Sequence, residues 1–313
     1  MERIIKQAAV EAAVKSAYEK FKSYKVEGSA IDPRMNPVVN GKFGLSVRLT
    51  DGSSIDYGDT ATLFPLGSLL RIPVMIQALA DLSIEEFVRK MNTGRCPAGC
   101  DGGVEKRPKG VHAKNLRMIS LLQPTDDADG KMQLISDKMI SLMGSSPVLD
   151  DKLFQKAMKE YENDGLEDLL AKNGYELYDS FSSTLEVATK LHSMLVTTVQ
   201  MARMGASIAA DGIDTVSGEP VFDGKISQSV VAMMASKGPK RIKKPWLMVT
   251  GVPAMSSFGG GFLAVIPGFG AISAFAPELV DGVIPFKAAM AVKEIVTSLD
   301  LNVFASARIK TEK

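Results

Sequence analysis

The chain has 313 residues, 45% of them hydrophobic, which is enough for one large core or two closely packed subdomains. Its 37 lysines and arginines balance 36 aspartates and glutamates, so the overall charge suggests neither a nucleic-acid nor a membrane partner. The stretch closest to a membrane span, residues 259–276, is interrupted by glycines and Pro267, and the N-terminus lacks the apolar core of a signal peptide. These features predict a cytoplasmic protein.

The N-terminal part of the sequence predicts a helix, a hairpin and a second helix. Apolar residues recur at helical spacing over residues 2–25. Alternating residues predict a strand at 42–49, and the turn at 51–52 leads into a second strand at 53–57. A helix is then predicted over residues 68–82.

The middle of the chain, residues 84–235, has helical patterns, and strand patterns return near the C-terminus. Strands are predicted at 246–250, 261–266 and 271–275, and a last helix at 286–299. This order predicts an α/β (α+β) fold in which both ends of the chain build an antiparallel sheet, and it argues against a doubly wound parallel sheet. Residues 1–70 and 245–313 are expected to form the sheet subdomain, and residues 71–244 a mainly helical one, in one compact unit.

A candidate nucleophile site follows the hairpin. Ser68 begins the second helix, and Arg71 follows one helical turn later. The string from Gly58 to Arg71 resembles the serine site of the acyl-transfer fold shared by penicillin-binding proteins, β-lactamases and glutaminases. In that fold a lysine at the position of Arg71 accepts the serine proton, which a guanidinium cannot do because it stays protonated. Ser68 is therefore either a nucleophile or an N-cap that satisfies amides at the helix start.

Further strings extend the resemblance over residues 28–304 to the glutaminase family. The strongest are Phe43–Val47, Gly58–Asp59, Ser193–Thr197, Met204–Ala206, Ala209–Gly212, Gly251–Gly261, Val265–Gly268 and Pro277–Leu279. The resemblance implies a β-lactamase/transpeptidase-like fold with an antiparallel sheet, flanking terminal helices and a helical subdomain. It also implies a homo-oligomer, because glutaminases assemble through their helical subdomain.

The resemblance also assigns roles to individual residues. In a glutaminase the motif serine, here Ser68, attacks the side-chain amide of glutamine, releases ammonia and forms an acyl-enzyme that water cleaves. The oxyanion would be held by the backbone N–H of Ser68 and by that of Phe258 or Gly259. Ser256 and Asn163 are carried over as further oxyanion- or substrate-binding residues. Neither a cofactor nor a metal is expected.

Many family positions carry another residue type in this chain. Three family tyrosine positions are occupied by Pro33, Ala188 and Lys240, and two family lysine positions by Arg71 and Met255. The family glutamine before the serine is Gly67, and a family glutamate is Lys156. A family string with a substrate-binding asparagine has no clear match around residues 114–119. Each lost polar partner weakens substrate binding by about 1–3 kcal/mol, and Lys156 would reverse the charge offered to a substrate ammonium group.

Three functions are compatible with this pattern, the last being a true glutaminase whose family positions align differently from those given above. The first is a non-catalytic homologue that acts as a scaffold, a regulatory subunit or a ligand-binding protein. The second is a divergent serine amidohydrolase that acts on glutamine or a related amide, with Ser68 as nucleophile and Lys240 as substitute base. Lys240 lies in a cationic segment, residues 237–244, whose crowding could lower a lysine pKa; the segment could instead be a solvated loop or meet an acidic partner.

Cys96 and Cys100, the only cysteines, lie in a loop rich in glycine and proline. Two thiols at this spacing could form a local disulfide, supply half of a metal site or stay reduced. A cytoplasmic location favours reduced thiols.

Overall fold

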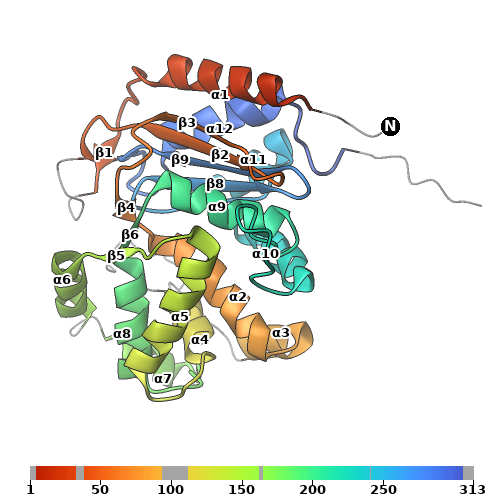
Figure 1. Ribbon diagram of the computed structural model, residues 1–313. Helices are drawn as coiled ribbons and strands as arrows, with labels where there is room; N and C mark the ends of the chain where they lie inside the picture. The colour runs from red at the N-terminus through yellow and green to blue at the C-terminus, as the bar shows by residue number, and fades with distance from the viewer. Residues whose placement is uncertain (1–4, 33–38, 94–111, 162–164, 240, 306–313) are drawn as a thin grey trace, which may run out of the picture.

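A five-stranded antiparallel sheet forms the upper half of the molecule (Figure 1). The computed structural model describes residues 5–32, 39–93, 112–161, 165–239 and 241–305. The strands of the sheet are β2 (Gly44–Leu49), β3 (Ser54–Gly58), β7 (Ala254–Ser256), β8 (Gly261–Ile266) and β9 (Gly270–Phe275). They lie in the order β3-β2-β9-β8-β7. Because β2 pairs with both β3 and β9, the predicted sheet built from both ends of the chain is confirmed.

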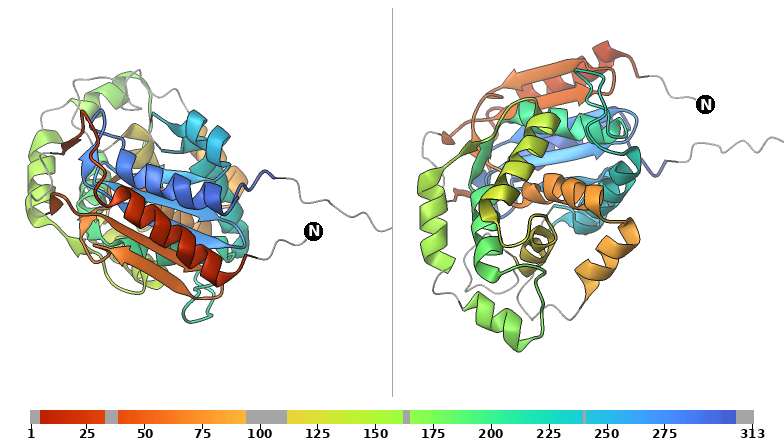
Figure 2. Two further views of the ribbon diagram at one scale, coloured as in Figure 1. Left: turned by 90° about the horizontal axis from the view of Figure 1, so that it is seen from above. Right: turned by 60° about the horizontal axis from the view of Figure 1, so that its bottom comes forward.

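Helices cover both faces of this sheet. Seen from above, α1 (Gln7–Phe21) and α12 (Phe286–Ser298) lie side by side over one face (Figure 2), and α9 (Thr198–Ala209) packs against the other. All residues of β8 and β9 are buried, and they alternate between two cores. Phe262 belongs to the core with α1 and α12, whereas Leu263 belongs to the core with α9. Successive side chains of a strand point to opposite faces, so the central strands hold both layers in place.

Most of the remaining helices build the lower half of the molecule (Figure 1). They are α2 (Arg71–Asp81), α3 (Ile84–Asn92), α4 (Ala113–Ser120), α5 (Ala128–Met143), α6 (Asp151–Tyr161), α7 (Leu166–Lys172), α8 (Phe181–His192) and α10 (Gly224–Lys237). A fully buried ion pair joins Lys131 of α5 to Asp179. No helix among the described residues is long and apolar enough to cross a membrane. The division of the chain at residues 70 and 245 stays a prediction.

Two small sheets connect these parts. One has the order β4-β6-β5 and consists of β4 (Phe64–Pro65), β5 (Val148–Leu149) and β6 (Met194–Val196). The other pairs β1 (Ala30–Ile31) with β10 (Glu278–Leu279). The sequence patterns predicted none of these short strands, because two or three residues are too few for a recognisable period.

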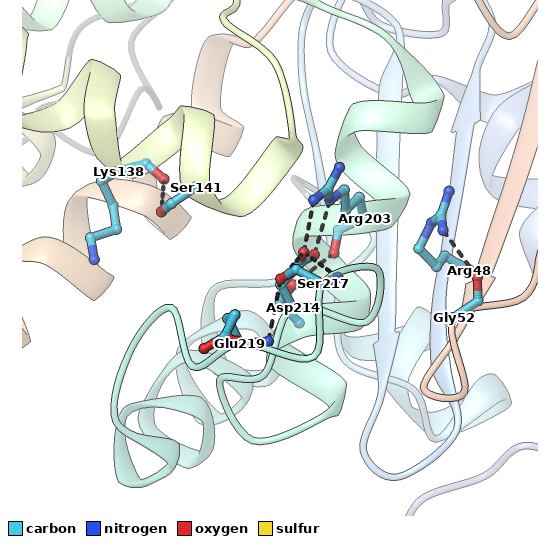
Figure 3. A network of polar contacts seen from close by, with 9 residues as sticks. Arg48, Gly52, Lys138, Ser141, Arg203, Asp214, Ser217 and Glu219 are labelled. Atoms are coloured by element: carbon cyan, nitrogen blue, oxygen red, sulfur yellow. Dashed lines mark hydrogen bonds and ion pairs between the residues drawn. The ribbon is translucent and has the colours of Figure 1, made fainter.

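The loop after α9 is fixed by a buried carboxylate. Arg203 donates to Asp214 from Nε at 2.9 Å and from Nη2 at 2.7 Å, and the backbone and hydroxyl of Ser217 donate to the same carboxylate (Figure 3). Burial raises the pKa of Asp214, but the hydrogen bonds from Arg203 and Ser217 outweigh it and bring the pKa down to about 2. The loop is therefore held by a charged pair of good geometry.

The predicted strand at residues 246–250 is wrong, because this segment lies in α11 (Lys243–Thr250). Trp246 and Thr250, four residues apart, are buried, while Met248 and Val249 between them are exposed. The indole of Trp246 donates to the Val252 carbonyl at 2.7 Å. A short apolar run does not distinguish a strand from one turn of helix, and here the burial at helical spacing shows which one forms.

Candidate active site

Ser68 lies in a short 3₁₀ helix, η2 (Gly67–Leu70), which continues directly into α2. The residue is almost fully buried, at 3% exposure. The N-cap position of η2 is Leu66, and that of α2 is Leu70, so Ser68 lies inside the helical segment. The N-cap interpretation of Ser68 is therefore wrong. η2 packs against both α8 and β7.

Gly67 allows the β7 side to approach Ser68 closely. Its φ of +52° is in the left-handed region, where a side chain is strained. A Cβ at this position would lie 2.5 Å from Ser257 Oγ and 2.8 Å from Phe258 Cε1. Any side chain at this position would therefore meet Ser257 and Phe258, which accounts for a glycine directly before Ser68.

Arg71 is held by an asparagine that the sequence did not indicate. Its Nε donates to Asn115 Oδ1 at 2.6 Å, a short distance that fits a charge-assisted hydrogen bond. Asn115 is fully buried on α4, and its Nδ2 has no hydrogen-bond partner among the described residues. The structure therefore places Asn115, from the segment without a clear family match, beside the motif arginine one turn after Ser68.

The loop after β7 is tied to the strand that precedes Ser68. Ser257 Oγ donates to the Pro65 carbonyl at 2.8 Å and accepts from the Gly259 amide at 3.0 Å. The Gly259 amide thus already has a partner within the loop. The oxyanion roles of Phe258 and Gly259 and the substrate-binding role of Ser256, which is buried on β7, stay predictions.

An aromatic pair closes the site from the side of α8. The rings of His192 and Phe258 stack with centroids 6.0 Å apart, and both residues are buried. Ala188, where the family has a tyrosine, is fully buried one turn earlier on α8. The surroundings of Ser68 are therefore more apolar than the resemblance implies.

Two of the replaced family positions are well defined in the structure. Met255 is buried on β7 and belongs to the core shared with α9. Lys156, in contrast, lies on the exposed side of α6. Within the described residues, no group of three histidine, cysteine, aspartate or glutamate side chains is placed to hold a metal ion.

Several predicted residues lie outside the described residues: Pro33, Asn163, Lys240, Cys96 and Cys100. Of the cationic segment 237–244, Lys243 and Lys244 are exposed at the start of α11, and Arg241 pairs with Asp281 at 3.5 Å. The assignment of Lys240 as a base stays a prediction.

Comparisons with known proteins show which family this chain is similar to. The family model described as Glutaminase matches residues 29–304. A glutaminase from Bacteroides thetaiotaomicron is 29% identical, over 97% of this chain and 98% of that protein. A glutaminase from Brucella canis is 27% identical, over 94% and 96% of the two chains.

Solved structures share the fold. The probable glutaminase ybaS has a TM-score of 0.85 and 24% identity, over 96% of this chain and 100% of that one. A glutaminase from Bacillus subtilis has a TM-score of 0.78 and 21% identity, over 95% and 99% of the two chains. That relative was solved as a covalent complex formed by its reaction with 6-diazo-5-oxo-L-norleucine.

Proposed function

The chain belongs to the glutaminase family, and from this premise we propose that it does not hydrolyse free L-glutamine. It acts instead as a non-catalytic member of the family, as a scaffold, a regulatory subunit or a ligand-binding protein. Self-assembly is part of this proposal, since the resemblance implies a homo-oligomer; the mass in solution, measured by light scattering, tests it.

The proposal depends mainly on Arg71, which stands where the fold usually has the proton-accepting lysine. A serine nucleophile needs a group that accepts its proton, and a guanidinium stays protonated at any pH at which proteins fold. Arg71 is also oriented by its hydrogen bond to Asn115, with the acceptor oxygen fully buried. Removal of the base from a serine hydrolase typically lowers the rate by several orders of magnitude. Ser68 therefore lacks the proton acceptor that the fold usually supplies.

Two other positions support the same conclusion. Met255 replaces the second lysine of the family pattern; its side chain is uncharged and is packed into the core. Phe258 lies close to Gly67, the residue before Ser68 in the chain, where the family glutamine would need space. A site that has lost several polar partners binds a polar substrate weakly, because each buried group of the substrate stays unsatisfied.

A divergent serine amidohydrolase is the second candidate. It is favoured by family membership over most of the chain and by the retention of Ser68 in a tight turn beside β7. In this alternative the base is Lys240, or the buried imidazole of His192 on α8, which packs against η2. A neutral imidazole could accept the serine proton directly.

Ammonia release separates the two candidates. The full chain is incubated with L-glutamine, with the Bacteroides thetaiotaomicron glutaminase as positive control and Ser68→Ala as background. We expect no release above the Ser68→Ala background and no mass increase with 6-diazo-5-oxo-L-norleucine, the reagent that reacts with the Bacillus subtilis relative. Release that disappears in Ser68→Ala would refute the proposal, and its loss in His192→Gln would then identify the base.

A further inference from the structure

A cleft opens between α6, α7 and α8, in the lower part of the molecule (Figure 1). Its volume is about 430 Å³, which is within the range of small-molecule sites. α8 has 12 residues and is about 18 Å long at 1.5 Å per residue. The cleft is lined by the N-terminal half of this helix, from Phe181 to Glu186, whereas His192 at the other end stacks on Phe258. The cleft therefore lies away from the surroundings of Ser68.

The floor of the cleft is apolar. Tyr161 of α6, Leu166 of α7 and Leu185 of α8 line it, and each of them is almost fully buried. Met158 and Phe181 also line it and are partly buried against the same core. A ligand that covers these groups removes apolar surface from water, so the cleft favours a ligand with an aliphatic or aromatic body.

The rim of the cleft is acidic. Glu167 and Asp168 are exposed in the first turn of α7, and Glu186 is half-buried on α8. Glu186 pairs with Lys190 at 2.7 Å, whereas neither Glu167 nor Asp168 forms a salt bridge with another residue in the described part of the chain. Among the described residues, no lysine or arginine lines the cleft. Two carboxylates at the rim can therefore pair with a cation that comes from outside.

We infer that this cleft binds an organic cation, a protonated amine carried by an aliphatic or aromatic body. The body covers the apolar floor, and the amine lies at the rim within reach of Glu167 and Asp168. An anion of the same size is repelled by the three carboxylates, and a neutral alcohol gains nothing from their charge. The aromatic side chains of Tyr161 and Phe181 add to the preference where a ring face meets the cation. The inference goes beyond the proposed function, because it concerns a second site and does not depend on whether Ser68 is active.

Methyl NMR of the full chain tests the inference, because three methionines report on separate places. Met158 lines the cleft, Met255 is buried on β7, which packs against η2, and Met248 is exposed on α11. Replacement of each by leucine assigns its signal. The probe is 4-phenylbutylamine, and its matched ligands are 4-phenylbutan-1-ol, with the same body and no charge, and 4-phenylbutanoate, with the opposite charge.

The amine should shift the Met158 signal until the cleft is saturated and leave the Met255 and Met248 signals unchanged. We expect the amine to bind about 3- to 30-fold more tightly than the alcohol, the range for two exposed ion pairs. The anion should bind more weakly than the alcohol, because it meets the same carboxylates with a like charge.

Glu167→Gln/Asp168→Asn gives the sharper test. It removes the charge of both rim carboxylates at exposed positions, so the amine should bind about 3- to 30-fold more weakly and the alcohol as before. Glu85→Gln/Glu86→Gln is the matched control, because it removes two acidic charges from the first turn of α3 and should leave both affinities unchanged. Thermal unfolding of each variant shows that it is folded.

Equal affinity for the amine and the alcohol, no shift of the Met158 signal, or an equal loss of affinity in the two double variants would each overturn the inference. So would an amine affinity unchanged in Glu167→Gln/Asp168→Asn, or a shift of Met255 without one of Met158. The ammonia assay decides the proposed function separately. Ammonia release together with a preference for the amine at Met158 contradicts the non-catalytic role alone. No release together with equal affinities contradicts the cation site alone.

Discussion

Replacement of Gly67 by alanine tests how tightly η2 packs against the loop after β7. Gly67 has a φ of +52°, and a Cβ in the left-handed region costs about 1–2 kcal/mol. The added methyl group would also lie 2.5 Å from Ser257 Oγ, which is itself held by Pro65 and Gly259. Overpacking of this kind costs about 1–3 kcal/mol. We therefore expect Gly67→Ala to lower the free energy of unfolding by about 2–5 kcal/mol in urea titrations followed by circular dichroism.

Gly174→Ala separates the two contributions. Gly174 has a φ of +59°, and an added Cβ there would meet nothing within 4 Å. This control should lose the backbone contribution alone, about 1–2 kcal/mol. An equal loss in both variants would refute the packing argument, because it would mean that Ser257 and Phe258 move aside at no cost. It would also remove the explanation for a glycine at the position of the family glutamine.

Three further predictions concern buried polar groups, and urea unfolding measures each of them. The folded-state pKa of Asp214 is lowered to about 2 from 3.8 by the hydrogen bonds from Arg203 and Ser217, so the ionised Asp214 contributes about 2 kcal/mol above pH 4, and this is lost as the pH falls toward 2. Asp214→Asn should remove that part of the pH dependence; an unchanged slope between pH 4 and pH 2 would contradict the assignment. Lys131→Met should cost about 3–5 kcal/mol because it leaves the Asp179 charge buried and unpaired, and Lys131→Met/Asp179→Leu should recover much of the loss. A double variant no better than the single one would count against this account. Trp246→Phe should cost about 1–3 kcal/mol because the Val252 carbonyl loses its indole donor, and a loss near zero would show that this bond contributes little.

The long elements could be predicted because their patterns are local. β8 and β9 were found from apolar runs separated by Pro267-Gly268, and α12 from its helical spacing. The segment 246–250 was misassigned because its apolar residues are consecutive. That it is a helix became clear only from the burial of Trp246 and Thr250, which are spaced as on one face of a helix. β6 was missed because its three residues form a strand through their partners β4 and β5 rather than through their own sequence.

The site could be predicted in part for a similar reason. Ser68 and Arg71 are only three positions apart, so the sequence alone predicts that they lie one helical turn from each other. The chemistry of the guanidinium then indicates that Arg71 cannot act as the base for Ser68. The contact between Arg71 and Asn115 joins residues 44 positions apart, and that between Ser257 and Pro65 joins residues 192 positions apart. No periodicity indicates such pairs, which depend on how α4 packs against α2 and how β7 packs against η2. The error on Ser68 as a cap arose because η2 begins before the predicted helix.

The pairing of β2 with β9 has a consequence for synthesis on the ribosome. Leu49 pairs with Gly270, about 220 residues later, so the hairpin of β2 and β3 emerges long before its second neighbour exists. At translation rates of about 5–20 residues per second the inner edge of β2 is without its partner for about 10–40 s. An unpaired strand edge is a template for association with other chains, and closure of so long a loop slows folding. The nascent chain is therefore expected to need protection by a chaperone until β8 and β9 have been made.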